Sequence, residues 1–229
     1  QEEYARAHKQ KAQMVTSFAD GTKISMEMAV VANATGFKTG RRGMYGPECG
    51  HVREAPGLFP EDQMLGGGLV DYVLGAEPAP GVFVIGHNED PVQKQYMNYY
   101  KMGDGPFYVF YTPFHLAHLE VAITAARGIL LQDTSVTPIG GPMCDVLAVA
   151  KRDLQPGDVL DGVGGFTAYG EIDNTSIIRD EGLLLMGLAA GSRIVRPVPR
   201  DQPITLADVE LDESRITVKL RREQDELFR

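Results

Sequence analysis

Residues 100–120 read YKMGDGPFYVFYTPFHLAHLE and set the fold expected for the first part of the chain. The GDGP segment at residues 103–106 is a turn signal. The aromatic run after it, residues 107–111, alternates as a half-buried strand does. From His115 to Gly128, apolar residues recur at helical spacing. Strands followed by a helix on one face predict an α+β layer with a mixed or antiparallel sheet.

Ionisable side chains interrupt this stretch, which otherwise suits burial. They are Lys101, Tyr111, His115 and Glu120. Burying such groups costs free energy unless they are paired or used, so the cluster is a candidate reaction site. A compact turn at residues 112–113 could bring Tyr111 and His115 together, and His115 could move a proton near neutral pH. The alternative is a half-buried histidine that caps its own helix, beside tyrosines that pack a core.

The segments before this stretch predict helices and a long loop. Three elements are expected first: a charged helix, a short strand and a second helix, over residues 1–14, 16–19 and 26–34. Ser25 suits the N-cap of the second helix, and Gly36 suits its end. Residues 36–68 are rich in glycine and predict a long loop, which is commonly functional or mobile. Beyond the loop we expect strands at residues 69–74 and 82–85, and a short helix or an extended segment at residues 93–101.

A second candidate site lies at the turn before the helix over residues 26–34. Lys23 could face a pocket from this turn, with Glu27 on the same side one helical turn later. A lysine beside a carbonyl polarises it, or exchanges protons when burial depresses its pKa. The alternative is a solvated Lys23 in an i,i+4 ion pair with Glu27. Asn33 and Glu27 complete this set as substrate-binding candidates.

The long loop carries Arg41 and Arg42 between glycines. Such a basic pair suits bidentate binding of a phosphate or carboxylate, although surface arginines are often simply solvated. Cys49 and His51 have no convincing third ligand nearby, and a zinc site needs three or four. We therefore expect no metal.

Composition excludes several classes of partner. The formal net charge of −9 argues against binding to nucleic acid, and no apolar run reaches the roughly 18 residues of a membrane span. Two cysteines far apart in the sequence favour a reducing cytoplasm.

The chain opens with QEEY, which is not an initiator sequence. We expect a piece of something longer or a processed product.

A composition shift near residues 137–142 predicts a domain boundary. We expect an α+β catalytic or substrate domain over residues 1–140 and a small all-β domain over residues 141–229. The β-like runs of the second domain are residues 145–150, 166–169, 183–186, 192–195 and 216–220. Neither Gly66–Gly68 nor the glycines between residues 162 and 170 have the GxGxxG spacing between a strand and a helix. A dinucleotide would therefore be held mainly by residues outside this chain.

Several motifs together resemble a known family. SFADGTK at residues 17–23, NATG at residues 33–36 and the run from Tyr99 to Glu120 resemble homoserine-dehydrogenase-like oxidoreductases, which include deoxyxylulose-phosphate-reductoisomerase-like enzymes. Residues 146–160 and 203–209 resemble a SAF (β-clip) domain. The resemblance implies an N-terminal Rossmann domain for NAD(P), a central catalytic domain that also makes dimer contacts, and a C-terminal SAF domain. This chain resembles the family without most of the Rossmann domain.

Our leading hypothesis is the substrate-binding and oligomerising part of an NAD(P)-dependent oxidoreductase. Its substrate would be a small polar or anionic carbonyl or hydroxy compound, phosphorylated or not. Lys23 would polarise the reacting oxygen, Tyr111 or His115 would move its proton, and Lys101 with the arginine pair would hold an anionic group. This requires Lys23 and the Lys101–Tyr111–His115 group to share one cavity. The alternatives are a non-catalytic SAF-type sugar-binding or assembly module, and a sugar-acid lyase, which would need a metal set that we do not find.

Overall fold

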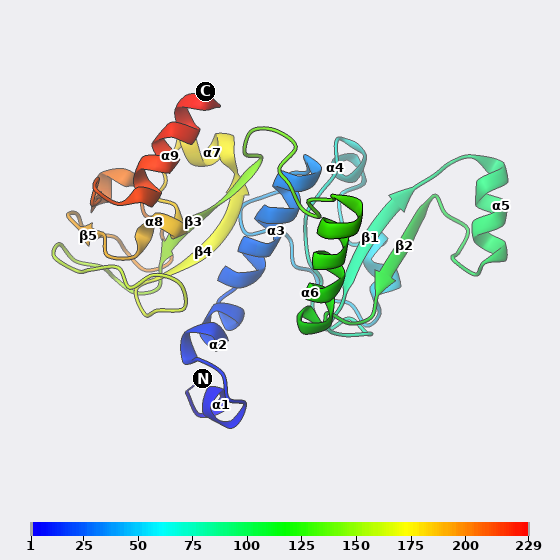
Figure 1. Ribbon diagram of the computed structural model, residues 1–229, viewed down its shortest axis with the longest axis horizontal. Coiled ribbons are helices and arrows are strands. Elements are labelled where there is room, and N and C mark those ends of the chain that lie inside the picture. The colour runs from blue at the N-terminus through cyan, green and yellow to red at the C-terminus, as the bar shows by residue number, and fades with distance from the viewer. Residues whose placement is uncertain (1, 229) are drawn as a thin grey trace. The chain divides into compact units, whose positions relative to one another are not determined.

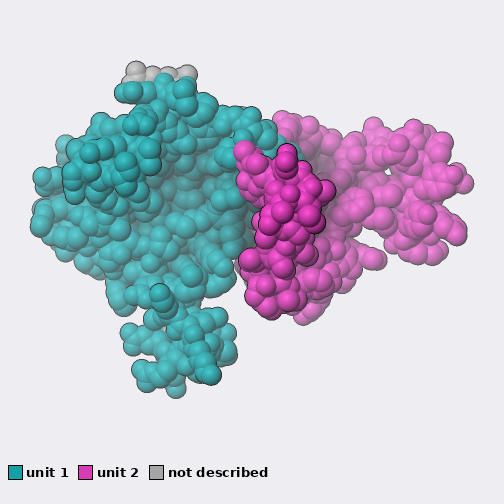
Figure 2. Space-filling view, viewed as in Figure 1, with its two compact units in different colours: residues 1–44, 138–229 teal, residues 45–137 magenta. Residues whose placement is uncertain are grey.

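The computed structural model describes residues 2–228 and forms two compact units (Figures 1 and 2). Unit 1 comprises residues 1–44 and 138–229, and unit 2 comprises residues 45–137. The chain returns to unit 1 close to the predicted boundary, and its first 44 residues pack with the C-terminal part. The two compact units therefore do not coincide with a division of the chain at residue 140. That division into two domains stays a prediction.

Unit 1 begins with three helices, α1 (Glu2–Ala7), α2 (Ala12–Ala19) and α3 (Thr22–Thr35). The strand predicted at residues 16–19 is wrong, because this segment is the end of α2, where it packs against α3. Helix α3 begins earlier than predicted, at a turn in which Asp20 Oδ1 accepts from the Thr22 amide at 2.9 Å. Ser25 is therefore a buried interior residue rather than an N-cap. Gly36 ends the helix in the left-handed conformation, as predicted.

The main sheet of unit 1 pairs β3 (Cys144–Ala150) with β4 (Ala168–Asn174) in antiparallel register. Helix α3 packs on this sheet, and Thr22 Oγ1 accepts a hydrogen bond from the Gly170 amide at 2.8 Å. A Cβ atom at Gly170 would lie 2.7 Å from Cγ1 of Val146, so only glycine allows this approach. The core beneath is apolar and includes Ala148, Leu154, Leu160, Leu184, Met186, Ile194 and Ile204.

The rest of unit 1 is a series of short elements. They are α7 (Thr175–Asp180), α8 (Met186–Ala189), β5 (Arg193–Ile194), the 3-10 helix η3 (Leu206–Asp208), β6 (Val209–Glu210) and α9 (Ile216–Leu227). The strand predicted at residues 216–220 is wrong, because this segment opens α9. Only Val218 of α9 is buried, and Arg221 and Asp225 pair one helical turn apart at 3.0 Å. The run at residues 183–186 forms isolated bridges instead of a strand.

Unit 2 is built around the antiparallel hairpin of β1 (Val82–His87) and β2 (Phe107–Thr112). Its helices are η1 (Val52–Gly57, 3-10), α4 (Glu61–Leu65), α5 (Pro91–Tyr99), α6 (Ala117–Ala126) and the π-helical turn η2 (Arg127–Leu131). The predicted strand over residues 107–111 and the helix after it are confirmed. The strand predicted at residues 69–74 is wrong, since this segment contains isolated bridge residues, Leu69 and Leu74, in place of a strand. Helices with small antiparallel sheets confirm the α+β class.

Candidate active site

Tyr111 lies near the end of β2 in a cluster with two basic side chains of unit 2. The His51 ring meets the Tyr111 ring edge-on, with ring centroids 6.2 Å apart. The Arg53 guanidinium carbon lies 6.0 Å from the centre of the same ring. A phenol, an imidazole and a guanidinium thus lie together at one end of the hairpin. The phenol and the imidazole are groups that transfer protons, and the guanidinium is a group that binds anions.

The fold of η1 fixes the two basic residues of this cluster. His51 is the N-cap of η1, and its Nδ1 accepts from the Arg53 amide at 3.1 Å. The Glu54 carboxylate in turn accepts from the His51 amide at 3.0 Å, which completes a capping box. Because Nδ1 is an acceptor, the neutral His51 ring carries its proton on Nε2. Sequence reasoning considered His51 only as a metal ligand, and the capping pattern of His51 with Glu54 was the missed signal.

His115 lies just before α6 and pairs with a carboxylate of that helix. Its Nδ1 is 3.1 Å from Glu120 Oε2, with about half of each side chain exposed. A carboxylate in this position orients an imidazole. The alternative in which His115 caps its own helix is not observed, because the N-cap of α6 is Leu116 and no side chain makes a capping hydrogen bond there. The ring contacts of Tyr111 described above are with His51 and Arg53, so the pairing of Tyr111 with His115 stays a prediction.

Lys101 lies away from this cluster within unit 2. It follows α5 with a positive φ of 63°, and Figure 1 places α5 beyond the end of the hairpin where β2 begins. Tyr111 is near the opposite end of β2, four residues or about 13 Å after Phe107. The hairpin therefore separates Lys101 from Tyr111.

Lys23 belongs to unit 1 and is engaged locally. Its Nζ lies 3.3 Å from Glu27 Oε1 and 4.0 Å from the centre of the Phe18 ring. A third of the Lys23 side chain is exposed. This is the i,i+4 pair that we gave as the alternative to a catalytic lysine. Lys23 and the Tyr111 cluster belong to different units, so their convergence on one cavity stays a prediction.

Asn33 makes hydrogen bonds with the segment that leads into β3. Its Oδ1 accepts from the Met143 amide at 2.6 Å and from the Cys144 amide at 3.2 Å. Its Nδ2 donates to the Cys144 carbonyl oxygen at 3.1 Å. These bonds use the amide of Asn33 to join α3 to β3, which is a structural role.

Arg42 also acts within unit 1, where it bridges two carboxylates. Its Nε donates to Asp173 at 2.8 Å, and its Nη2 donates to Glu181 at 2.7 Å. Burial opposes the charge of Arg42, but the hydrogen bonds to Glu181 and Asp173 outweigh it and raise its pKa. The neighbouring Arg41 donates from Nε to the Met44 carbonyl oxygen at 2.8 Å. No local pattern indicates the Asp173 and Glu181 partners, because they lie more than 130 residues away from Arg42.

These positions lie in a range of the chain that matches a known domain. Residues 1–121, more than half of the chain, match the family model of oxidoreductase DRL, catalytic domain. The chain belongs to the oxidoreductase DRL family. Residues 146–210 match the SAF domain, which confirms the predicted C-terminal domain. No curated protein matches the chain.

The DRL domain contains every residue that we predicted for the site, from Lys23 to His115. An oxidoreductase catalytic domain indicates a nicotinamide cofactor in general terms. Within residues 2–228, the glycine runs do not form a phosphate-binding turn between a strand and a helix: Gly66–Gly68 follow α4, and the loop at residues 162–165 joins β3 to β4. These residues therefore do not fit a complete dinucleotide site. In the same range, no three His, Cys, Asp or Glu side chains are placed to share a metal ion.

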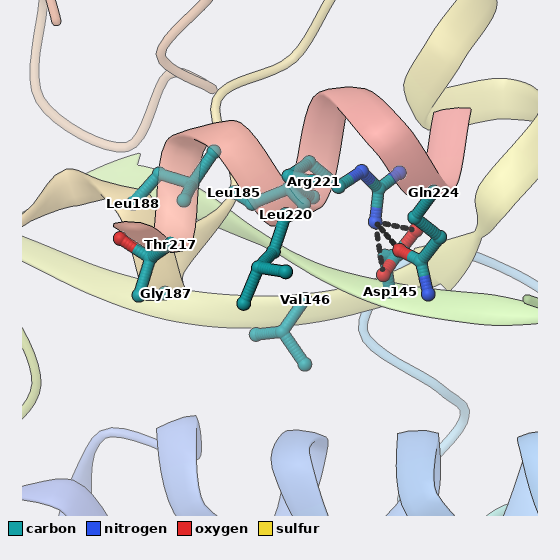
Figure 3. Close-up of a pocket in the computed structure, with 9 residues that line it drawn as sticks. All are labelled: Asp145, Val146, Leu185, Gly187, Leu188, Thr217, Leu220, Arg221 and Gln224. Atoms are coloured by element: carbon teal, nitrogen blue, oxygen red, sulfur yellow. Dashed lines mark hydrogen bonds and ion pairs between the residues drawn. The ribbon is translucent and has the colours of Figure 1, made fainter. Parts of the chain in front are cut away.

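Unit 1 has an open hollow of about 430 Å³ beside β3, α8 and α9 (Figure 3). At its polar end, Arg221 Nη1 donates to both oxygens of Asp145, at 2.9 and 3.0 Å, and Gln224 lies beside them. Leu185, Leu188 and Leu220 contribute the apolar lining. Because its charges already neutralise one another, we assign no role to this hollow.

None of the helices within residues 2–228 is long and apolar enough to cross a membrane.

Proposed function

We propose that the chain is the substrate-binding and catalytic portion of an NAD(P)-dependent oxidoreductase. Its substrate is a small polar or anionic carbonyl or hydroxy compound, phosphorylated or not. The observation that carries the proposal is the cluster of Tyr111, His51 and Arg53 inside the DRL-matched range. Within the DRL family, the motifs from Ser17 to Lys23 and from Tyr99 to Glu120 favour the homoserine-dehydrogenase-like and reductoisomerase-like group.

Interconversion of a hydroxyl and a carbonyl group requires a proton to leave or reach the substrate oxygen. The Tyr111 hydroxyl exchanges this proton beside the guanidinium group of Arg53. His51 or His115 passes the proton on to solvent. Lys23 and Arg41 of unit 1 and Lys101 of unit 2 stay separate predictions, the first as a group that polarises a substrate oxygen and the other two as groups that attract an anionic group. Arg42, already shared between two carboxylates, orients the loop that carries Arg41.

The nicotinamide cofactor is held mainly by a domain outside these residues, and the protein acts in the cytoplasm. Unit 2 supports assembly into a homo-oligomer. Leu119, Val121 and Ile123 of α6, and Ile129 to Leu131 of η2, are each more than half exposed. Exposed apolar patches of this kind mark interaction surfaces.

The activity is tested on the complete polypeptide that contains this chain. Hydroxy acids, polyols and their phosphate esters are offered one at a time with NAD⁺ or NADP⁺, and formation of the reduced nicotinamide is followed by absorbance. We expect turnover with at least one class of compound. A polypeptide that binds the cofactor but turns over no member of this panel would contradict the proposal.

A non-catalytic SAF-type binding module is the second candidate, and it is favoured because the glycine runs within residues 2–228 do not form a phosphate-binding turn. Titration of residues 1–229 with NADH, followed by nicotinamide fluorescence, tests where the cofactor binds. We expect no tight binding by this chain alone. A dissociation constant in the micromolar range would overturn the assignment of the cofactor to another domain.

A further inference from the structure

A second hollow of unit 1, of about 300 Å³, lies between the end of α2 and the loop from β3 to β4. One wall comes from the DRL-matched range and the other from the SAF-matched range. Its lining residues are Thr16, Ala19, Asp20, Lys151, Gly165 and Phe166. This volume is at the lower end of the range for small-molecule sites, roughly 300–1,000 Å³. It therefore suits a molecule of about the size of one sugar unit.

The polar part of this hollow is an ion pair with unused hydrogen-bonding capacity. Lys151 Nζ lies 2.6 Å from Asp20 Oδ2, and both side chains are more than four-fifths buried. Lys151 Nζ also donates to the Gly165 carbonyl oxygen at 2.7 Å. An ammonium group has three donors, and the bond to Gly165 uses only one of them. Asp20 Oδ2 is buried and, despite the nearby ammonium, receives no well-directed hydrogen bond.

The apolar part of the hollow is Phe166, which is 81% exposed on a loop of fixed shape. The Asp161 carboxylate holds this loop by accepting from the Phe166 amide at 2.5 Å and the Thr167 amide at 3.1 Å. Gly162 and Gly164 adopt positive φ angles of 81° and 72° there. A Cβ atom at Gly164 would also lie 2.0 Å from the Gln13 carbonyl oxygen. The loop thus keeps the Phe166 ring exposed to solvent beside the Asp20–Lys151 ion pair.

We propose that this hollow binds a polyhydroxylated compound through two neighbouring hydroxyl groups. One hydroxyl donates to Asp20 Oδ2, the next accepts from Lys151 Nζ, and the C–H face of the compound covers the Phe166 ring. An anionic group does not fit, because the Asp20 carboxylate repels it. A wholly apolar ligand would leave the ion pair buried without new hydrogen bonds, which is unfavourable. The inference concerns binding by unit 1 and does not depend on the redox step.

The test is isothermal titration of residues 1–229 with xylitol as the polyhydroxylated probe. The comparison probes are pentane-1,5-diol, which lacks neighbouring hydroxyls, and inorganic phosphate. We expect xylitol to bind at least tenfold more tightly than either. Equal binding of xylitol and pentane-1,5-diol, or tighter binding of phosphate, would overturn the proposal.

Variants locate the site within unit 1. Phe166→Ala should weaken xylitol binding about tenfold, and Asp20→Asn, which keeps the size of the side chain, should weaken it at least as much. Val163→Ala in the same loop is the matched control and should bind as the wild type does, because Val163 does not line the hollow. Circular dichroism confirms that each variant is folded.

Unchanged xylitol binding by folded Phe166→Ala and Asp20→Asn variants would place the ligand elsewhere and refute this site. Tyr111→Phe should bind xylitol normally, which separates this test from that of the proposed function.

Discussion

Arg42 joins two carboxylates of very different exposure, since the side chain of Asp173 is 2% exposed and that of Glu181 is 47% exposed. Arg42→Ala would leave the Asp173 carboxylate buried without its cation. We expect a loss of about 3–5 kcal/mol in the free energy of unfolding, measured by urea denaturation. Arg222→Ala is the matched control, because Arg222 forms an exposed ion pair with Glu213. This control should cost at most about 1 kcal/mol. Equal losses in the two variants would contradict the role of Arg42.

The thiol of Cys144 gives a pH dependence of stability. Burial raises the pKa of Cys144 to about 11, whereas an unfolded cysteine ionises near its ordinary pKa of about 9. Between these values the unfolded chain has released the thiol proton and the folded chain has kept it. Stability should therefore fall as pH rises through this window, by on the order of 2 kcal/mol. Urea denaturation from pH 8 to pH 11 measures this fall.

The Cys144→Ala variant is the control for that measurement. It should lose the part of the pH dependence that comes from the thiol and keep the part that comes from Tyr169, whose pKa burial raises to about 12. Identical profiles for the wild type and Cys144→Ala would show that Cys144 ionises equally in both states.

Among single residues, the sequence predicted local pairs and missed distant ones. The Lys23–Glu27 pair follows from i,i+4 spacing on a helix. The Tyr111 cluster depends on the packing of η1 against β2. No local sequence pattern predicts this packing. The partners of Arg42 come from β4 and from the residue after α7, so only the folded chain brings them together.

At the level of elements, the contact between α3 and β4 depends on Gly170. Gly170→Ala would place a Cβ atom 2.7 Å from Val146 and 3.1 Å from Thr22. We expect a loss of about 1–3 kcal/mol from overpacking, seen as a lower midpoint in thermal denaturation. Gly187 in α8 is the matched control, since a Cβ atom there would meet no atom within 4 Å. Gly187→Ala should be neutral or stabilising, by up to about 1 kcal/mol. A Gly170→Ala variant as stable as the wild type would contradict this contact.

Elements with strong local signals were predicted well. The alternating aromatic run of β2 and the glycine that ends α3 are such cases. The errors at α2 and at the start of α9 arose where a short segment suits either a strand or a helix. In α9, the ion pairs that Arg221 makes with Asp145 and Asp225 favour the helix. Tertiary contacts of this kind are not visible in a window of a few residues.

For the whole molecule, the exposed apolar helices of unit 2 predict self-association. Paired substitutions, Ile123→Glu with Leu130→Glu, place charges on side chains that are 62% and 77% exposed. We expect the wild type to form an oligomer, and this variant to dissociate toward the monomer with its secondary structure intact. Light scattering coupled to size-exclusion chromatography measures both masses. A monomeric wild type, or an unchanged mass in the folded variant, would contradict this expectation.

The organisation of the whole chain was predictable only in part. Sequence motifs indicated the oxidoreductase and SAF parts, and the matches over residues 1–121 and 146–210 confirm both. That the first 44 residues pack with the SAF part was not predictable. This packing depends on long-range contacts, such as the bonds of Asn33 with Met143 and Cys144, which leave no periodic pattern in the sequence.

The central claim is that Tyr111 exchanges the substrate proton in a nicotinamide-dependent reaction. The most direct measurement is kcat/KM of the complete polypeptide for its best substrate, compared between Tyr111→Phe and Tyr99→Phe. Tyr99 is 75% exposed on α5 and serves as the matched control. We expect Tyr111→Phe to lower kcat/KM by about 10²–10⁴-fold, and Tyr99→Phe to leave it within about twofold of the wild type. Equal activity of the folded Tyr111→Phe variant and the wild type would contradict the claim.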